Sequence, residues 1–210
     1  MSDLYKNTLT SPAKMLFPLL SHFKEDFYMA GGTSLALQIG HRVSVDFDLF
    51  SGLPIKKTLL KKVEEVFKGK AVQVLVNNSS ELTILTDGVK CTFLQYPFPV
   101  ILPLVQTNSA PLLSVKEILA TKAYTIGRRG ELKDYVDMYI GFKDNHAVLS
   151  EVLEIARKKY GEAFNDRLFL EQLVYGEDLE EVAITMVSGS APSKSEMIDY
   201  FSETVKNITL

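Results

Sequence analysis

The sequence has one cysteine, Cys91, and three histidines among its 210 residues. A single cysteine excludes an internal disulfide and is typical of a protein of the reducing cytoplasm. His22, His41 and His146 have no second histidine at metal-ligand spacing, which argues against a zinc site. The sequence also lacks an N-terminal signal pattern and any apolar run near the roughly 18 residues that a membrane helix needs. We therefore expect that the protein is not an integral membrane protein.

Positive charge is not in excess either. The chain carries 23 basic and 26 acidic residues, a formal net charge of −3. This balance excludes a surface coated with positive charge, as in a general nucleic-acid binder, but not a local basic patch. With 46% hydrophobic and 23% charged residues, the composition is that of an ordinary globular protein of one large or two small domains.

The N-terminal half is predicted to mix helices with strands. The expected helices cover 12–23 (with a kink at Pro18), 33–40 (ended by Gly40) and 55–67. The expected strands cover 26–30, 44–50, 71–78, 81–98 (with a hairpin turn at Asp87-Gly88) and 100–107.

The C-terminal half is predicted to be helical. Helices are expected over 114–130, 131–142, about 146–160, 163–174 and 176–187, and a last helix follows the linker 188–193. Ser114 with Glu117, and Ser193 with Glu196, have the spacing of capping boxes. The fold class is therefore α+β, with an α+β N-terminal half and a helical C-terminal half.

Two aspartates interrupt the apolar strand "VSVDFDLF". Residues two apart in a strand face the same side, so Asp46 and Asp48 project together while Val45, Phe47 and Leu49 face the core. Paired carboxylates suit a hard divalent cation, which cancels their repulsion. Magnesium binds through one or two carboxylates plus substrate phosphates, so this pair predicts a phosphorylated ligand.

A glycine turn precedes this strand. Gly31 and Gly32 allow a ligand to approach the backbone, and Thr33 or Ser34 offers a hydroxyl at a helix start, where phosphate is favoured. Taken alone, this turn also fits an ordinary helix start, and the D-x-D pattern also fits an exposed strand. Their order and spacing together favour nucleotidyl transfer.

The block "AGGTSLALQIGHRVSVDFDLF" resembles the signature of the AbiEii/AbiGii nucleotidyltransferase toxin family, a branch of the DNA polymerase β-like superfamily. The resemblance covers residues 12–142. It implies a mixed-sheet polymerase β-like core over 1–110 and a helical region over 111–210 that completes the active-site cleft. It also implies a cytoplasmic, Mg²⁺-dependent enzyme (with Mn²⁺ as the alternative ion) that transfers a nucleoside monophosphate from an NTP to an acceptor, RNA and above all tRNA. A cognate antitoxin protein is the implied partner.

The family's second motif resembles "EILATKAYTIGRRGELKDYVDMY". It implies that Lys122 and Asp134 are catalytic, together with Asp46 and Asp48, and that Arg129 binds nucleotide with Lys122 and residues 31–34. Lys122 falls inside an apolar helical stripe, so it either extends to water or meets a phosphate. Asp134 and Asp137 lie on the polar side of their helix, which also fits two solvated acids, and the role of Asp137 stays open.

One departure from the polymerase β-like pattern concerns a third metal-binding acid on a later strand. The segment "VKCTFLQYP" offers Thr92 and Gln95 there but no carboxylate, while Glu81 and Asp87 lie at a strand start and at the hairpin tip. A second metal is then held weakly, another acid substitutes, or activity is reduced. Cys91 in this strand is expected to be an inert core thiol.

The acceptor is the least constrained part of the prediction. Lysines 56, 57, 61 and 62 and the Arg128-Arg129 pair are candidates for RNA contacts, although a lysine-rich helix is also typical of a solvated face. Rival functions are a small-molecule nucleotidyltransferase of the antibiotic-modifying kind, a D-x-D glycosyltransferase, and a non-catalytic nucleotide-binding relative.

Overall fold

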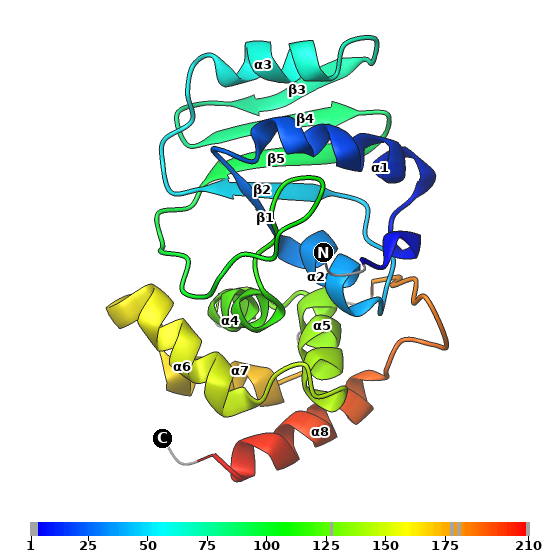
Figure 1. Ribbon diagram of the computed structural model, residues 1–210. Coiled ribbons are helices and arrows are strands. Elements are labelled where there is room, and N and C mark those ends of the chain that lie inside the picture. The colour runs from blue at the N-terminus through cyan, green and yellow to red at the C-terminus, as the bar shows by residue number, and fades with distance from the viewer. Residues whose placement is uncertain (1–3, 127, 177–178, 180–181, 209–210) are drawn as a thin grey trace. The chain divides into compact units, whose positions relative to one another are not determined.

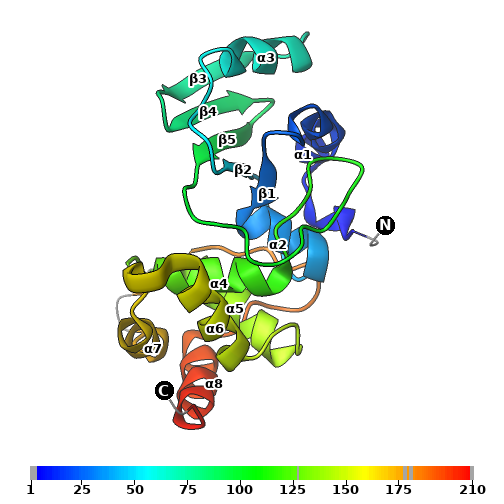
Figure 2. The same cartoon turned by 60° about the vertical axis from the view of Figure 1, so that its left-hand side comes forward.

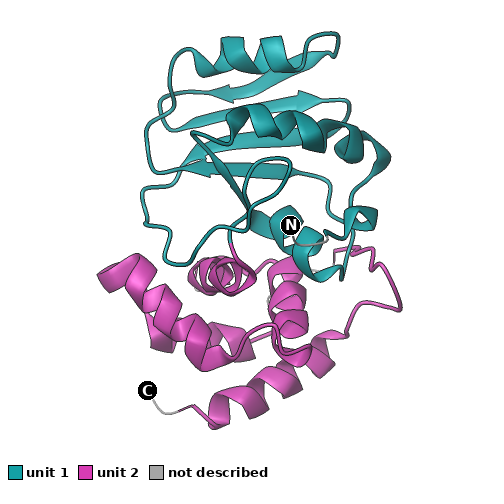
Figure 3. Ribbon diagram, viewed as in Figure 1, with its two compact units in different colours: residues 1–113 teal, residues 114–210 magenta. Residues whose placement is uncertain are grey.

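The computed structural model describes residues 4–126, 128–176, 179 and 182–208. The chain divides into two compact units, Met1–Leu113 and Ser114–Leu210 (Figures 1 and 3). Within the described residues, no helix is both long and apolar enough to cross a membrane.

The first unit is built on a mixed sheet of five strands. They are β1 (Tyr28–Ala30), β2 (Phe47–Ser51), β3 (Val72–Asn77), β4 (Glu81–Thr86) and β5 (Val89–Gln95). Their order across the sheet is β1-β2-β5-β4-β3 (Figure 1). Only β2 and β5 run parallel, and the other neighbours are antiparallel. The predicted α+β class with a mixed N-terminal sheet is confirmed.

Helices cover one face of this sheet. The unit contains η1 (Lys6–Thr8), α1 (Ser11–Leu16), η2 (Phe17–Phe23), α2 (Gly31–Ile39) and α3 (Leu59–Val66). Phe47, Leu49 and Phe93 are fully buried on the covered face. The Phe23 ring lies 4.9 Å from the Phe93 ring and 6.4 Å from the Phe67 ring at the end of α3, so η2 and α3 pack on the same face (Figure 2).

Local sequence signals set several boundaries of the first unit. The helix expected over 12–23 changes from α to 3₁₀ geometry at Phe17, next to Pro18. Gly40 ends α2 in the left-handed region, at φ +73°. Asp87 (φ 49°) and Gly88 (φ 75°) form the predicted hairpin turn.

The strand predicted over 100–107 is wrong. This segment has a single isolated bridge, Val105 to Leu112, and no regular strand. Pro103 lacks the N–H group that a strand ladder requires, which accounts for the failure.

The second unit is helical. It contains α4 (Val115–Ile126), α5 (Leu132–Lys143), α6 (Leu149–Tyr160), η3 (Gly161–Ala163), α7 (Asp166–Val174) and α8 (Lys194–Lys206). The helix predicted over 176–187 is wrong where the structure describes it, because residues 182–187 are not helical. Val182, Ile184, Thr185 and Val187 are β-branched and weak helix formers. Residues 177–178 and 180–181 of that prediction lie outside the described residues.

The two predicted capping boxes have different outcomes. Ser193 accepts a hydrogen bond from the Glu196 N–H (3.2 Å) and caps α8, but the Glu196 carboxylate accepts from Tyr139 and Lys143 instead of closing the predicted box. The box at Ser114 is wrong, because Glu117 turns into the helical core, where its carboxylate accepts from Lys159 at 2.7 Å. Both side chains of that pair are fully buried, so each needs the other's charge.

Candidate active site

The carboxylate of Asp48 lies against the start of α2. Asp48 on β2 pairs with Ala30, the last residue of β1, and α2 begins at the next residue, Gly31. Gly31 has φ +69°, and a Cβ built on it would overlap Oδ2 of Asp48. The free N–H groups and the positive dipole end of α2 therefore favour the Asp48 charge, which offsets the cost of placing a carboxylate in an apolar strand.

The two glycines belong to α2 itself. The helix was predicted to begin at Thr33, and the structure begins it at Gly31. A Cβ on Gly32 would overlap Nη2 of Arg42, a buried arginine that also donates to the Val43 carbonyl oxygen at 3.3 Å. Both glycines thus permit a close approach, one of a carboxylate and one of a guanidinium.

The hydroxyls of Thr33 and Ser34 are engaged within the protein. Thr33 donates to the Asp46 carbonyl oxygen and lies 2.7 Å from the Ser44 hydroxyl. Ser34 is fully buried, with the Gln38 amide 3.5 Å from its hydroxyl oxygen. Thr33 therefore fixes the segment that carries Asp46, and the groups of α2 best suited to phosphate are its first backbone N–H groups.

Asp46 lies just before β2 rather than inside it. Its side chain is 39% exposed, and the Lys90 ammonium on β5 lies 3.4 Å from its Oδ2. The expected burial of Val45 is wrong, since this residue is 45% exposed where the regular strand has not begun, while Phe47 and Leu49 are buried as predicted. Sequence reasoning missed Lys90. Its place beside Asp46 follows from the parallel pairing of Cys91 with Phe47, which the sequence alone does not reveal.

The two aspartates act on a common neighbour. Burial, and then the charges of Asp46 and Asp48, raise the pKa of the Cys91 thiol to about 12. Both carboxylates thus lie close enough to one thiol to repel its anion. Cys91 is fully buried, as expected of a core thiol.

These residues fit a divalent cation that takes further ligands from its substrate. In the part of the chain that the structure describes, no group of three or more His, Cys, Asp or Glu side chains is arranged to hold a metal ion. Two carboxylates with access to solvent, beside a helix start suited to phosphate, match the donor set with which magnesium binds nucleotides.

On β5, where a third metal-binding acid was considered, the residue directly beside Asp48 is Thr92. The parallel register pairs these two residues directly. Asp87 at the hairpin tip forms a 2.5 Å ion pair with Lys70. It lies beyond the Thr86–Val89 pair that ends the β4–β5 ladder, and so away from Asp48 and Thr92.

In the second unit, Lys122 lies between two aspartates. Its Nζ is 2.7 Å from Oδ1 of Asp134 and 2.7 Å from Oδ2 of Asp137. The three side chains are 8%, 4% and 0% exposed, respectively. The alternatives of a lysine extending to water and of two solvated acids are therefore wrong, because α4 supplies a buried countercharge to α5.

Arg129 adds an accessible cation to this cluster. Its guanidinium lies 2.7 Å from Glu131 and 3.4 Å from Asp134, and its side chain is 54% exposed. The structure thus brings Lys122, Arg129 and Asp134 together around the α4–α5 connection. Burial, and then the Asp134 charge, raises the pKa of the neighbouring Tyr135 to about 12.

A cavity of about 330 Å³ opens beside Arg129 within the helical unit. It is lined by Arg128, Arg129, Gly130, Tyr135, Gln172, Tyr175 and Leu179. Arg128 donates to the carbonyl oxygens of Tyr124 (3.0 Å) and Ala163 (2.7 Å), and its guanidinium stacks on the Tyr124 ring at 3.6 Å. These partners are neutral, so they hold the guanidinium in place without cancelling its charge.

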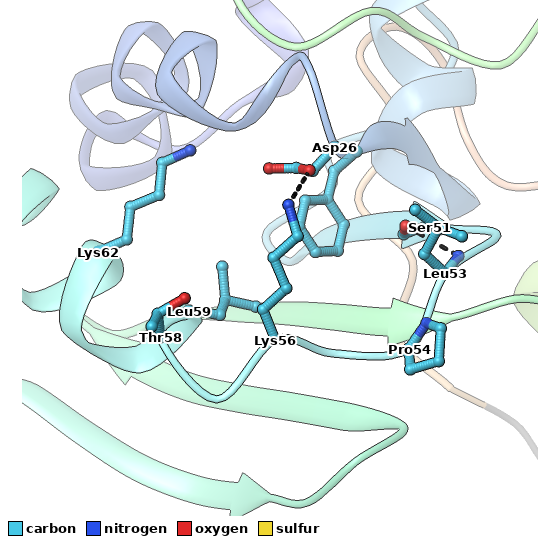
Figure 4. Close-up of a pocket in the computed structure, with 9 residues that line it drawn as sticks. Asp26, Ser51, Leu53, Pro54, Lys56, Thr58, Leu59 and Lys62 are labelled. Carbon is cyan, nitrogen blue, oxygen red and sulfur yellow. Dashed lines mark hydrogen bonds and ion pairs between the residues drawn. The ribbon is translucent and has the colours of Figure 1, made fainter.

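A smaller cavity lies beyond the end of β2 (Figure 4). Two of the candidate RNA-binding lysines line it. Lys56 forms a 2.6 Å ion pair with Asp26, and Lys62 lies over the Phe23 ring at 5.2 Å. A volume of about 40 Å³ holds a few waters and no nucleotide.

The fold is similar to that of solved nucleotidyltransferases. MenT4, a nucleotidyltransferase toxin from Mycobacterium tuberculosis, superposes with a TM-score of 0.64 at 17% identity, covering 94% of this chain and 85% of its own. JHP933 from Helicobacter pylori superposes with a TM-score of 0.52 at 16% identity, covering 79% and 74%. At these identities the likeness shows the fold alone.

The sequence relationships identify the family. Residues 15–196 match the family described as nucleotidyl transferase AbiEii toxin, type IV toxin–antitoxin system. The protein aq_aa25 of Aquifex aeolicus (strain VF5) is 30% identical over 183 residues, 86% of this chain and 87% of its own. The chain therefore belongs to the AbiEii family of nucleotidyltransferase toxins, as its motifs predicted. Such enzymes generally use divalent metals, and a type IV toxin implies a nucleotide substrate and an antitoxin.

Proposed function

We propose that the protein transfers a nucleoside monophosphate from an NTP to a hydroxyl of an RNA acceptor, with tRNA as the first candidate. The reaction takes place in the cytoplasm, and a cognate antitoxin restrains it. The observation that carries the proposal is the position of the Asp48 carboxylate against Gly31, at the positive end of α2.

Asp46 and Asp48 are the residues that hold Mg²⁺, with Mn²⁺ as the alternative ion. When bound, the ion neutralises the triphosphate and stabilises the charge that develops on the leaving pyrophosphate. The first N–H groups of α2, at Gly31, Gly32 and Thr33, bind phosphate oxygens. Thr33 acts indirectly as well, because its hydroxyl holds the Asp46 backbone.

The helical unit supplies the remaining proposed groups. Arg129 is the accessible cation for phosphate, and Asp134 and Glu131 orient its guanidinium. Lys122 neutralises Asp134 and Asp137, which keeps Asp134 in place. These roles depend on the family motif and are consistent with the ion pairs among these residues.

The RNA acceptor is supported by charge and shape. Arg128 and Arg129 line a cavity of about 330 Å³, large enough for part of a nucleotide. Guanidinium groups beside a tyrosine suit a phosphate backbone and an unstacked base. Binding through such contacts weakens steeply with salt.

The test combines the protein with total RNA, Mg²⁺ and each labelled NTP in turn. Label is expected on a tRNA-sized band, and it is lost in Asp46→Asn and Asp48→Asn. Asp26→Asn is the matched control, because Asp26 pairs with Lys56 at the other cavity. Label only on a small molecule would identify an antibiotic-type enzyme instead, and no transfer to any acceptor would identify a non-catalytic relative.

Nucleotide binding gives a second readout that does not depend on the acceptor. Calorimetry should show Mg²⁺-dependent NTP binding that is absent in Asp46→Asn/Asp48→Asn, with an unchanged melting temperature. An unchanged NTP affinity in this double variant would remove the proposed metal site.

A further inference from the structure

Three side chains of the helical unit form one stacked column. The rings of Tyr124 on α4 and Tyr160 on α6 are nearly parallel, with their centroids 4.0 Å apart and an angle of 10° between their planes. The guanidinium carbon of Arg128 lies 3.6 Å from the centroid of the Tyr124 ring. Both separations are van der Waals contacts, so the two groups cannot share one face of that ring. The order of the column is therefore Tyr160, Tyr124, Arg128, across the contact between α4 and α6 (Figure 2).

Backbone oxygens hold the edge of the Arg128 guanidinium. Nη1 donates to the Tyr124 carbonyl oxygen at 3.0 Å, and Nη2 donates to the Ala163 carbonyl oxygen at 2.7 Å. These bonds fix the orientation of the group. They also use part of the pair of in-plane N–H groups with which an arginine binds a phosphate. The guanidinium is thus better prepared to offer its planar face than its edge.

The Arg128 end of the column borders the cavity of about 330 Å³. Arg128 is exposed and lines this cavity. Because Tyr124 covers one face of the guanidinium, a ligand in the cavity meets the opposite face. Tyr135 and Tyr175 also line the cavity. Its volume is near the lower end of the range of ligand pockets, roughly 300–1,000 Å³, which suits one base with its sugar and excludes a longer segment of RNA.

We propose that this cavity binds one unpaired base of the acceptor RNA, which stacks on the Arg128 guanidinium and extends the column; this inference rests on the proposed nucleotidyl transfer to RNA. Unstacked RNA bases are bound on aromatic rings and on arginine planes. Such stacking accepts any base, because every base has a π face. Arg129, which is 54% exposed beside the same cavity, is the cation for the adjoining phosphate. The two neighbouring arginines thus have different roles, one for the base and one for the backbone.

A triphosphate suits this cavity less well than an RNA base. The charge of Arg129 is shared with Glu131 and Asp134. Arg128, whose partners in the described part of the chain are neutral, then adds one positive charge, which does not balance a triphosphate. A purely structural alternative is that Arg128 only caps α4, since it donates to a carbonyl oxygen of the last turn. A cap stabilises the helix, but it does not distinguish a ligand with a base from a ligand without one.

The test compares two short single-stranded RNA chains with the same number of phosphates. One chain is abasic throughout, and the other has 2-aminopurine as its single base. The wild-type protein should bind the chain with the base about 5- to 100-fold more tightly, the range expected for one stacked base. The fluorescence of 2-aminopurine should be quenched on binding, and the protein has no tryptophan that would obscure the signal.

Arg128→Lys keeps the positive charge and removes the planar group. The preference for the chain with the base should disappear in this variant, together with the quenching. The salt dependence of binding should stay the same, because the charge is kept. The preference is a ratio measured on one protein sample, so a loss of folded protein does not change it. Arg157→Lys is the matched control and should keep the preference, because Arg157 on α6 is an exposed arginine that pairs with Asp166 at 3.0 Å.

Three results would overturn this inference alone. The first is equal affinity of the wild-type protein for the two chains, and the second is an unchanged preference in Arg128→Lys. The third is a loss of Mg²⁺-dependent NTP affinity in Arg128→Lys as large as its loss of RNA affinity, since the stacked base would then belong to the NTP. The proposed function fails by a separate result, in which the wild-type protein transfers no label from any NTP to RNA.

Discussion

Lys122 on α4 places its ammonium nitrogen 2.7 Å from an oxygen of Asp134 on α5, and both side chains are at most 8% exposed. Asp137 meets the same nitrogen at 2.7 Å. Two negative charges thus share one buried positive charge, with the partly exposed Arg129 3.4 Å from Asp134. This cluster links the helical unit's stability to its proposed role in nucleotide binding.

Lys122→Met should destabilise the protein by about 3–5 kcal/mol, because it leaves two buried carboxylates without their countercharge. Apolar packing of the methionine stem cannot offset that loss. Urea unfolding measures the change. Lys116→Met is the matched control on the same helix, since the Lys116–Glu151 pair is about 40% exposed on each side and should contribute only about 0–1 kcal/mol. Equal losses in the two variants would show that the buried cluster is not the cause.

Gly31→Ala should lower both stability and Mg²⁺-dependent NTP affinity. A side chain at φ +69° costs about 1–2 kcal/mol, and the new Cβ displaces the Asp48 carboxylate. The affinity should fall at least about tenfold, as expected when a charged contact is lost. Gly69→Ala separates the two effects, because Gly69 has φ +89° and open space around it. A calorimetric NTP affinity that is equal in the two variants would contradict the expected displacement of Asp48.

Alkaline pH should destabilise the protein partly through Cys91. Its thiol pKa is raised from 9.0 to about 12 by burial and by the nearby aspartates, so the folded state favours the protonated thiol. That stabilisation is complete below pH 9.0 and is lost as the pH rises toward about 12. Unfolding midpoints in urea at about pH 8 and about pH 10 should therefore differ less in Cys91→Ala than in the wild type. Tyr135 titrates in both proteins, so its effect on the unfolding midpoint cancels when the variant is compared with the wild type. An identical difference would exclude a contribution from Cys91.

Local chemistry made much of the first unit predictable. Gly40 ends α2 because a left-handed residue is needed there, and Asp87-Gly88 turns the hairpin for the same reason. Asp46 and Asp48 were identifiable because carboxylates in an apolar strand require compensation. These signals lie within a few residues of the structure that they specify.

The missed features depend on partners far apart in the sequence. Asp134 was assigned to a polar helix face, because the periodicity of one helix does not reveal a lysine supplied by another. Glu117 has the spacing of a capping residue, yet it pairs with Lys159 across α4 and α6. The Lys90–Asp46 contact follows from the parallel register of β2 and β5, which no local pattern encodes.

Lys90→Met should reduce the Mg²⁺ concentration that NTP binding requires. Lys90 lies 3.4 Å from Asp46, and both side chains are partly exposed, so the ion pair should be worth about 0.2–1 kcal/mol. A cation must compete with this lysine for the carboxylate, so its removal should lower the required Mg²⁺ by about 1.5- to 5-fold at low salt. The difference should shrink as salt screens the pair.

Calorimetric NTP titrations over a series of Mg²⁺ concentrations, without acceptor, measure this effect. Lys70→Met is the matched control, because Lys70 pairs with Asp87 at the hairpin tip of the same sheet and should leave the Mg²⁺ requirement unchanged. A higher Mg²⁺ requirement in Lys90→Met would show the opposite role for Lys90, that of a cation that itself binds the nucleotide phosphates. An equal requirement in Lys90→Met and the wild type would show that the ion pair does not compete with the metal, because exposed pairs are readily replaced by water.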